Sequence, residues 1–151
     1  MSDLPTDSFE SVLSRHPFVV RRKVRWSDCD PAGVVYTGRF PEFVLSANNL
    51  FYSELAQGSW REWLKGMAVD TPCKGMEFEF HGALWPDDEF LIRGTVSAIR
   101  KHSYDIRYEA AQADGRRIFS ARFSPICISN TGKREGVPIP DAMRARLQDF
   151  S

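Results

Sequence analysis

Apolar residues recur at helical spacing over one continuous stretch of the chain, between residues 40 and 55. They fall mostly three or four positions apart, at Phe40, Phe43, Val44, Ala47, Leu50, Phe51 and Leu55. This spacing predicts an α-helix of roughly four turns. Because the apolar face of this helix is wide, we expect the helix to be buried rather than to lie on the surface.

Two shorter helices are predicted beside the long one. Gly58 is a suitable residue to end the long helix, and Ser59 can cap a short helix that carries Trp60, Trp63 and Leu64. Residues 137–150 contain prolines ahead of a mixed polar and apolar run, which predicts a terminal helix that begins at a proline.

The remaining stretches alternate apolar and polar residues, a pattern typical of β-strands. One precedes the long helix, at residues 17–26, and four follow a break at residues 70–72. These four are separated by turn signals and cover residues 76–85, 89–100, 104–112 and 116–129. One helix followed by a run of strands predicts an α+β domain with an antiparallel sheet. We expect this sheet to curve strongly around the long helix.

The first residues of the chain match neither pattern. They predict a flexible N-terminal arm at residues 1–16, followed by a single domain at residues 17–151. A chain of 151 residues is long enough to bury one core without disulfide bonds.

Composition and charge exclude several classes of partner. Lys and Arg number 20, as do Asp and Glu, so no net charge attracts nucleic acid or a membrane surface. The first residues are acidic and lack an apolar core, so we expect no signal peptide. The chain also lacks an apolar run of about 18 residues. The three cysteines are an odd number without metal-ligand spacing, which favours a reducing compartment, and we expect a cytoplasmic protein. The histidines, at positions 16, 81 and 102, show no ligand spacing, so no metal is predicted.

The motif Asp28-Cys29-Asp30-Pro31-Ala32-Gly33 joins the first strand to the long helix. It imitates the start of a calcium-binding EF-hand loop. That interpretation fails because Ala32 and Arg39 occupy two ligand positions of such a loop. A magnesium-dependent phosphotransferase is also disfavoured, because the chain lacks alternating strands and helices and the further carboxylates of such a site.

The two acids of the motif suggest different functions. For Asp28 we favour a local cap or turn function. Asp30 is open to a turn function or to catalysis, because the start of a buried helix offers unpaired N–H groups and a positive dipole end. A carbonyl group between Asp30 and those donors would face a nucleophile or base on one side and oxyanion donors on the other. Cys29 lies between two acids, which disfavours its thiolate.

The sequence DCDPAGVVY, followed by a helix rich in Phe and Tyr, resembles the signature of the 4-hydroxybenzoyl-CoA thioesterase family of hotdog-fold proteins. The resemblance runs from about Arg22 to the last strand. It implies a curved antiparallel sheet wrapped around one central helix, with Asp30 as the catalytic acid. It further implies that the backbone N–H of Thr37 is the oxyanion donor and that Tyr36, Gly38 and Thr71 contact substrate. Members of the family form homodimers that assemble into homotetramers, with active sites between subunits.

The basic turn at Arg100, Lys101, His102 and Ser103 has two interpretations. Charged hairpin turns are commonly only solvated. The resemblance implies instead that this turn clamps the phosphates of coenzyme A, a role that cationic side chains suit. Coenzyme A is then part of the substrate, and no cofactor is expected.

Two positions depart from the family pattern. Arg39-Phe40 stands where the family often has Asn-Tyr, and Leu45 stands where it commonly has an acid. Asn48 and Asn49 interrupt the long helix, where each could be exposed or reach across a subunit boundary. Trp60 and Trp63 are the aromatics least explained by helix burial, and they could line an acyl pocket.

The sequence therefore predicts an acyl-CoA thioesterase for a small aromatic (hydroxybenzoyl or benzoyl type) or short-chain acyl group. Asp30 would act as nucleophile or as general base, and the residues leave both open. One alternative is a hotdog protein that binds acyl-CoA without hydrolysing it. A hotdog dehydratase is disfavoured because no histidine lies near the motif in sequence.

Overall fold

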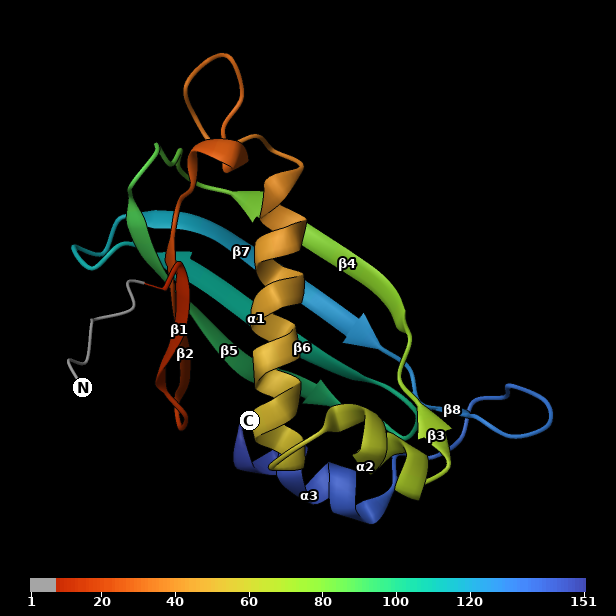
Figure 1. Cartoon of the computed structure of the whole chain (residues 1–151). Coiled ribbons are helices and arrows are strands. Elements are labelled where there is room, and N and C mark those ends of the chain that lie inside the picture. The colour runs from red at the N-terminus through yellow and green to blue at the C-terminus, as the bar shows by residue number, and fades with distance from the viewer. Residues whose placement is uncertain (1–7) are drawn as a thin grey trace, which may run out of the picture.

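The computed structural model describes residues 8–151 and confirms the α+β class. A six-stranded antiparallel sheet, in the order β1-β2-β5-β6-β7-β4, curves around the long helix α1 (Figure 1). Its strands are β1 (Glu10–Ser14), β2 (Phe18–Lys23), β4 (Cys73–Phe80), β5 (Glu89–Ile99), β6 (Tyr104–Ala111) and β7 (Arg117–Pro125). The short strands β3 (Val69–Asp70) and β8 (Ile128–Ser129) pair with each other. The helices are the 3-10 helix η1 (Trp26–Asp28), α1 (Arg39–Ala56), α2 (Trp60–Gly66) and α3 (Asp141–Asp149).

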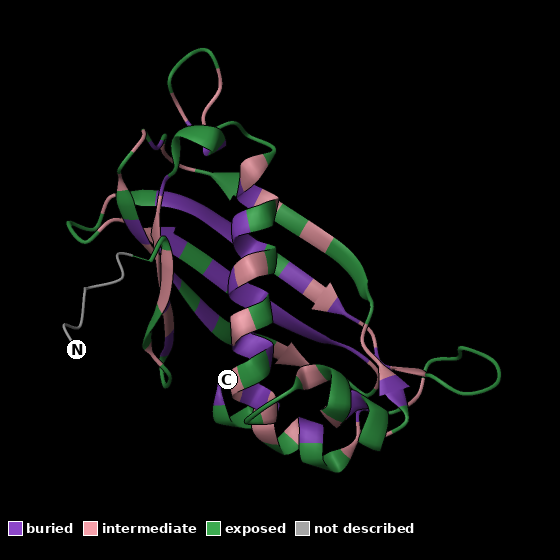
Figure 2. Cartoon of the chain, viewed as in Figure 1, coloured by how far each residue is buried: buried purple, intermediate pink, exposed green. Residues whose placement is uncertain are grey.

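Helix α1 is the centre of the core, as its apolar pattern predicts. One face of the helix is buried against the concave face of the sheet (Figure 2). Phe43 contacts Phe90 of β5 with 5.4 Å between ring centroids, and Phe40 contacts Phe119 of β7 at 5.6 Å. Each buried Phe contributes about 1.5–3 kcal/mol through the hydrophobic effect. These two contacts fix the N-terminal end of α1 relative to the sheet.

The ends of the helices follow the predicted signals. The Ser59 hydroxyl accepts a hydrogen bond from the Glu62 N–H at 3.2 Å and so caps α2. Pro140 precedes α3. At the end of α1, Gln57 adopts the left-handed conformation that ends many helices, one residue before the predicted Gly58. None of the helices in residues 8–151 is long and apolar enough to cross a membrane.

The expectation of a flexible arm at residues 1–16 is wrong for its second half. Residues 10–14 form β1, which pairs with β2 at the edge of the sheet. The carboxylate of Glu10 accepts hydrogen bonds from Ser46 of α1 at 2.6 Å and from Arg22 of β2 at 2.8 Å. A strand of five residues is too short for its pattern to stand out, and tertiary contacts determine it. The start of the predicted arm, residues 1–7, lies outside the described residues.

Candidate active site

The DCDPAG motif forms the tip of a tight hairpin that projects beyond the start of α1 (Figure 1). The Tyr36 N–H donates to the Asp28 carbonyl and the Asp30 N–H to the Val34 carbonyl, both at 2.9 Å, with Cys29 and Val35 paired between them. Gly33 then closes the turn through its N–H to the Asp30 carbonyl at 2.9 Å. Its φ of +82° explains the glycine at this position.

The two faces of this hairpin differ in their surroundings. Val35 is buried, and Cys29 packs against the same core. Side chains alternate along a strand, so Asp30 and Tyr36 project from the opposite face. Burial, and then the neighbouring carboxylates of Asp28 and Asp30, raise the pKa of the Cys29 thiol. This agrees with the expectation that the thiolate of Cys29 is disfavoured.

Asp28 has the local function that we predicted. The residue is 5% exposed, and its Oδ2 accepts a hydrogen bond from the Arg25 N–H at 2.8 Å, which caps η1. A buried carboxylate bound in this way is part of the scaffold of the loop.

Asp30 combines a turn function with an available oxygen atom. Its Oδ1 accepts a hydrogen bond from the Ala32 N–H at 2.9 Å, two residues ahead in its own turn. Its Oδ2 accepts no hydrogen bond from residues 8–151. The side chain is only partly buried, and Pro31, Ala32 and Gly33 beside it are exposed. Asp30 thus stands near the tip of an exposed loop.

The start of α1 leaves two backbone N–H groups available to a ligand, those of Thr37 and Gly38. The Arg39 N–H bonds the Tyr36 carbonyl at 2.8 Å and the Phe40 N–H bonds the Thr37 carbonyl at 3.2 Å. The N–H groups of Thr37 and Gly38 donate to no acceptor in the described part of the chain. Gly38 is the N-cap residue, and no side chain caps the helix there. These two N–H groups are therefore able to polarise a carbonyl group at the positive end of the helix dipole.

Tyr36 covers this helix start. A Cβ atom placed on Gly38 would lie 2.5 Å from Cε1 of Tyr36, so the ring lies directly over the glycine. Tyr36 is itself 57% exposed. The structure thus brings Tyr36, Thr37 and Gly38 together at one end of α1, with Asp30 about 7 Å farther out along the hairpin than Tyr36.

The remaining predicted residues lie at the other end of α1. The Thr71 side chain lies close to the hydroxyl groups of Tyr52 and Tyr104, near the C-terminal end of the helix. The basic turn of residues 100–103 lies nearby, where the Ile139 N–H ahead of α3 bonds the Lys101 carbonyl at 2.8 Å. The 18 residues of α1 span about 27 Å. Within one chain, the predicted site residues therefore form two groups, one at each end of α1.

Arg100 in the basic turn already has an acidic partner. Its guanidinium group donates to both oxygens of Asp105, at 3.1 and 2.7 Å, and lowers the pKa of that carboxyl group. Asp105 is 4% exposed. Ser103 is also buried, while Lys101 is exposed and His102 is partly buried. Because Asp105 neutralises Arg100, Lys101 is the residue of this turn whose positive charge remains available.

A buried polar network occupies the C-terminal end of α1. The hydroxyl groups of Tyr52 and Tyr104 lie 2.8 Å apart, and the Tyr108 hydroxyl donates to Oδ1 of Asn48 at 2.6 Å. Burial raises the pKa of Tyr52 to about 12. Asn48 therefore points into its own core, while Asn49 is exposed.

Trp60 belongs to the same region as this network. Its ring stacks on Tyr52 at 3.8 Å between centroids, and Trp63 packs against Trp60 at 5.4 Å. These contacts account for Trp60 and Trp63 by packing.

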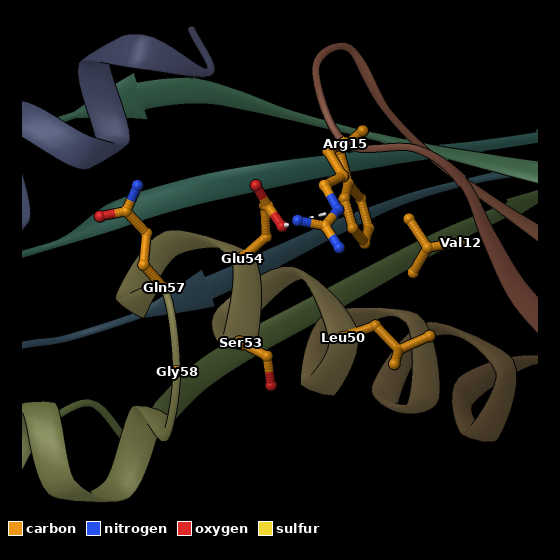
Figure 3. A pocket seen from close by; sticks show the side chains of 8 residues that line it. Val12, Arg15, Leu50, Ser53, Glu54, Gln57 and Gly58 are labelled. Atoms are coloured by element: carbon orange, nitrogen blue, oxygen red, sulfur yellow. Dashed lines mark ion pairs between the residues drawn. The ribbon is translucent and has the colours of Figure 1, made fainter.

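A cavity of about 430 Å³ lies on another side of α1, and neither Asp30 nor Thr37 lines it. It is formed by the β1–β2 hairpin and the C-terminal half of the helix. Figure 3 shows Arg15 and Glu54 facing each other across it, with the ion-pair atoms 4.0 Å apart. No group of three or more His, Cys, Asp or Glu side chains in residues 8–151 is arranged to hold a metal ion.

The sequence analysis did not predict two side-chain contacts near the candidate site. Arg39 reaches back from α1 to the Ser27 carbonyl, and Asp105 neutralises Arg100. Arg39 stands out in the sequence only as a departure from the family pattern. The pairing of Arg100 with Asp105 requires the register of the β5–β6 hairpin, which short-range patterns do not fix.

One long helix wrapped by a curved antiparallel sheet, with an acidic turn ahead of an uncapped helix start, defines a hotdog-fold protein. The chain belongs to the Thioesterase-like superfamily, whose family model matches residues 24–147. By sequence, no curated protein matches the chain.

Solved structures support the fold. A 1,4-dihydroxy-2-naphthoyl-CoA thioesterase from Synechocystis has a TM-score of 0.78 at 23% identity, covering 88% of this chain and 96% of that one. The 4-hydroxybenzoyl-CoA thioesterase from Pseudomonas sp. strain CBS-3 has a TM-score of 0.74 at 19% identity, covering 85% and 96%. A thioesterase superfamily protein from Jannaschia sp. CCS1 has a TM-score of 0.76 at 27% identity, covering 99% and 97%. The predicted family resemblance and the hotdog fold are confirmed.

Proposed function

We propose that this protein hydrolyses the thioester of an acyl-CoA to a free acid and coenzyme A. The main support is the combination of superfamily membership with an acidic turn beside two unpartnered N–H groups at the start of α1. The thioester carbonyl binds at the N–H of Thr37, which stabilises the developing oxyanion. One such donor typically contributes about 10²–10³-fold to turnover.

Asp30 supplies the second part of the chemistry. Its Oδ2 either attacks the thioester carbon, forming a mixed anhydride and releasing the thiolate of coenzyme A, or removes a proton from the attacking water. A thiolate is a good leaving group, so neither route requires an acid to protonate it. The hydrogen bond from Ala32 to Oδ1 leaves Oδ2 available and fixes the direction of the carboxylate.

A small aromatic or short apolar acyl group suits the helix surface beside this site. Leu45 lies two turns after Thr37 on α1 and is 48% exposed. It offers an apolar contact where the family commonly has an acid. Two structural neighbours are thioesterases of aromatic acyl-CoAs, 1,4-dihydroxy-2-naphthoyl-CoA and 4-hydroxybenzoyl-CoA. We propose that the acyl group is a small aromatic group, of the hydroxybenzoyl or benzoyl type, or a short acyl chain.

A homodimer would bring together the two groups of site residues that one chain separates. Strand β4 is an unpaired edge of the sheet and runs beside α1 from Cys73 to Phe80. Antiparallel pairing of β4 with the same strand of a second copy would place Phe80 of each chain near Cys73 of the other. The end of α1 that carries Thr37 would then face the end that carries Thr71 and the basic turn in the second copy. A homodimer, assembling into a homotetramer, is therefore part of the proposal.

In such a dimer Lys101 and His102 would bind the phosphates of coenzyme A, with Ser103 and Arg100 holding the turn in place. The cationic side chain of Lys101 is exposed and suited to a mobile polyanion. The three cysteines are free thiols, which supports a reducing, cytoplasmic location.

The decisive experiment measures thiol release over aromatic, short-chain and long-chain CoA esters with Asp30→Asn. The matched control is Asp114→Asn, because Asp114 accepts the same type of hydrogen bond, from the Arg116 N–H at 2.9 Å, in another turn. We expect Asp30→Asn to lose nearly all turnover and to keep CoA-ester binding, and Asp114→Asn to match the parent protein. Turnover of Asp30→Asn within a few-fold of the parent would refute the assignment.

The alternative function is acyl-CoA binding without hydrolysis. The observation that favours it is the hydrogen bond of Asp30 within its own turn, which gives this acid a purely structural use. Saturable binding without thiol release by the parent protein, over the whole ester panel, would select this alternative.

A further inference from the structure

Arg39 occupies an electrostatically unfavourable position. It is the first residue of α1, where the helix dipole is positive and an acidic residue is preferred. Two acidic residues, Glu42 one turn later and Asp28 before the loop, can offset the unfavourable position of the Arg39 charge. The side-chain contacts of Arg39 show what an arginine does at this position.

The guanidinium group of Arg39 joins both sides of the loop that carries Asp30. One terminal nitrogen donates to the Ser27 carbonyl, 12 residues earlier, at 3.0 Å. The other donates to Oε2 of Glu42 at 2.7 Å, and Nε lies 3.9 Å from Oδ1 of Asp28. Residues 29–38, including the candidate nucleophile and the oxyanion donor, lie between the elements that Arg39 connects.

Apart from the buried side chain of Val35 and the packing of Cys29 against the core, the loop has few other restraints. Its tip is exposed and projects away from the sheet (Figure 1). Its backbone hydrogen bonds to the rest of the protein are few, the main one being the Val35 N–H to the Leu84 carbonyl at 2.8 Å. Exposed segments with few buried contacts open locally at low free-energy cost. A side chain that connects the base of this loop to α1 therefore restricts movement of the loop.

Position matters strongly for the proposed reaction. A nucleophile or base and an oxyanion donor must hold one carbonyl group between them, and a displacement of 1 Å can cost about 10²-fold in rate. Asp30 lies two residues beyond Asp28, and Thr37 lies two residues before Arg39. The bridge from Arg39 to Ser27 and Asp28 acts at the base of this hairpin, in addition to the hairpin's own hydrogen bonds from Tyr36 to Asp28 and from Asp30 to Val34.

We propose that Arg39 is a positioning residue, which locks the Asp30 loop against the start of α1 and so sets the distance between Asp30 and the Thr37 N–H. This inference rests on the proposed thioesterase function. Arg39 contacts neither reacting group, so its effect appears in turnover rather than in substrate affinity.

The test compares Arg39→Gln and Arg39→Lys with the control Arg107→Gln, which removes an exposed arginine that binds one carboxylate, Glu109, at 2.7 Å on the outer face of β6. We expect Arg39→Gln to lower kcat by about 10- to 100-fold with KM within about 3-fold of the parent. Arg39→Lys keeps the charge near Glu42 and Asp28 and should recover part of the loss. Arg107→Gln should match the parent.

Hydrogen exchange supplies a readout that does not depend on catalysis. The amide hydrogens of Asp30 and Tyr36, which are bonded within the hairpin, should exchange faster in Arg39→Gln, while amides of β5 and β6 should be unchanged. A kcat within about 2-fold of the parent, a change in KM alone, or unchanged exchange at Asp30 and Tyr36 would each overturn the inference. If the parent protein hydrolyses no ester, the proposed function fails, and the exchange measurement alone decides whether Arg39 holds the loop.

Discussion

The guanidinium group of Arg100 binds both carboxylate oxygens of Asp105, at N–O distances of 3.1 and 2.7 Å, across the turn between β5 and β6. Asp105 is buried, while the Arg100 side chain is 50% exposed. The positive charge of Arg100 is thus used within the fold, and a substrate phosphate would compete for it.

The first prediction concerns the stability of this pair. Arg100→Ala should lower the free energy of unfolding by about 1 kcal/mol, because a buried carboxylate loses its partner while solvent screens the exposed half of the pair. Denaturant unfolding at neutral pH measures the difference. Lys101→Ala, one residue away and exposed, should leave the unfolding midpoint unchanged, and an equal loss in both variants would contradict the pairing argument.

The same pair predicts the pH dependence of this difference. Arg100 lowers the pKa of Asp105 from its usual 3.8, so the stabilisation is complete above that value and is lost as the pH falls through the lower folded-state pKa. The stability gap between the parent and Arg100→Ala should therefore shrink below about pH 4. Unfolding midpoints measured from pH 7 down to pH 3 test this. A gap that widens on acidification would show that the sign is wrong.

The second prediction separates the phosphates of coenzyme A from the thioester. Lys101→Ala should raise KM for CoA esters and leave KM for short pantetheine esters unchanged, because only CoA carries the phosphates that an exposed ammonium group binds. Steady-state kinetics on both ester types make the comparison. The exposed Lys65 of α2 provides a control as Lys65→Ala, which should change neither constant. Equal effects of Lys101→Ala on both esters would refute the proposal that Lys101 binds the phosphates of coenzyme A.

The third prediction concerns Tyr36 and Gly38. Gly38→Ala should lower turnover, because its Cβ would lie 2.5 Å from Cε1 of Tyr36 and must push the ring aside at the helix start. The backbone of Gly38 has φ of −66°, which alanine adopts without strain. Thiol release by Gly38→Ala, Tyr36→Ala and the double variant measures the effect. The double variant should be no slower than Tyr36→Ala alone, and an additive loss would mean that the alanine acts on something other than the ring.

The fourth prediction is a loss of stability in alkaline solution. Burial raises the pKa of Tyr52 to about 12 and places those of Tyr104 and Tyr108 well above the usual 10.0. The unfolded chain ionises these phenols near pH 10, so stability is full below pH 10 and falls as the pH rises. Absorbance titration of phenolate, with circular dichroism beside it, should show these three ionising late and together with unfolding. Ionisation of all four tyrosines near pH 10 in a folded protein would contradict this.

Local sequence patterns were sufficient for much of the fold. The helical spacing of apolar residues in α1 and the turn residues of DCDPAG act over a few positions, and each structure follows from them. The cap function of Asp28 is local for the same reason, since it binds the N–H of Arg25 three residues away. Strand β1 was missed because its five residues depend on contacts with Ser46 and Arg22.

The sequence by itself determined most of the elements, including the buried helix and the acidic turn before it, because periodicity, turn chemistry and capping depend on near neighbours. Only the tertiary structure decided which charges remain available. It paired Arg100 with Asp105 through strand register, brought Arg39 back to Ser27, and placed Thr71 and the basic turn a helix length away from Asp30. Those relationships arise from how the sheet wraps α1, which sets distances between residues that no local pattern connects.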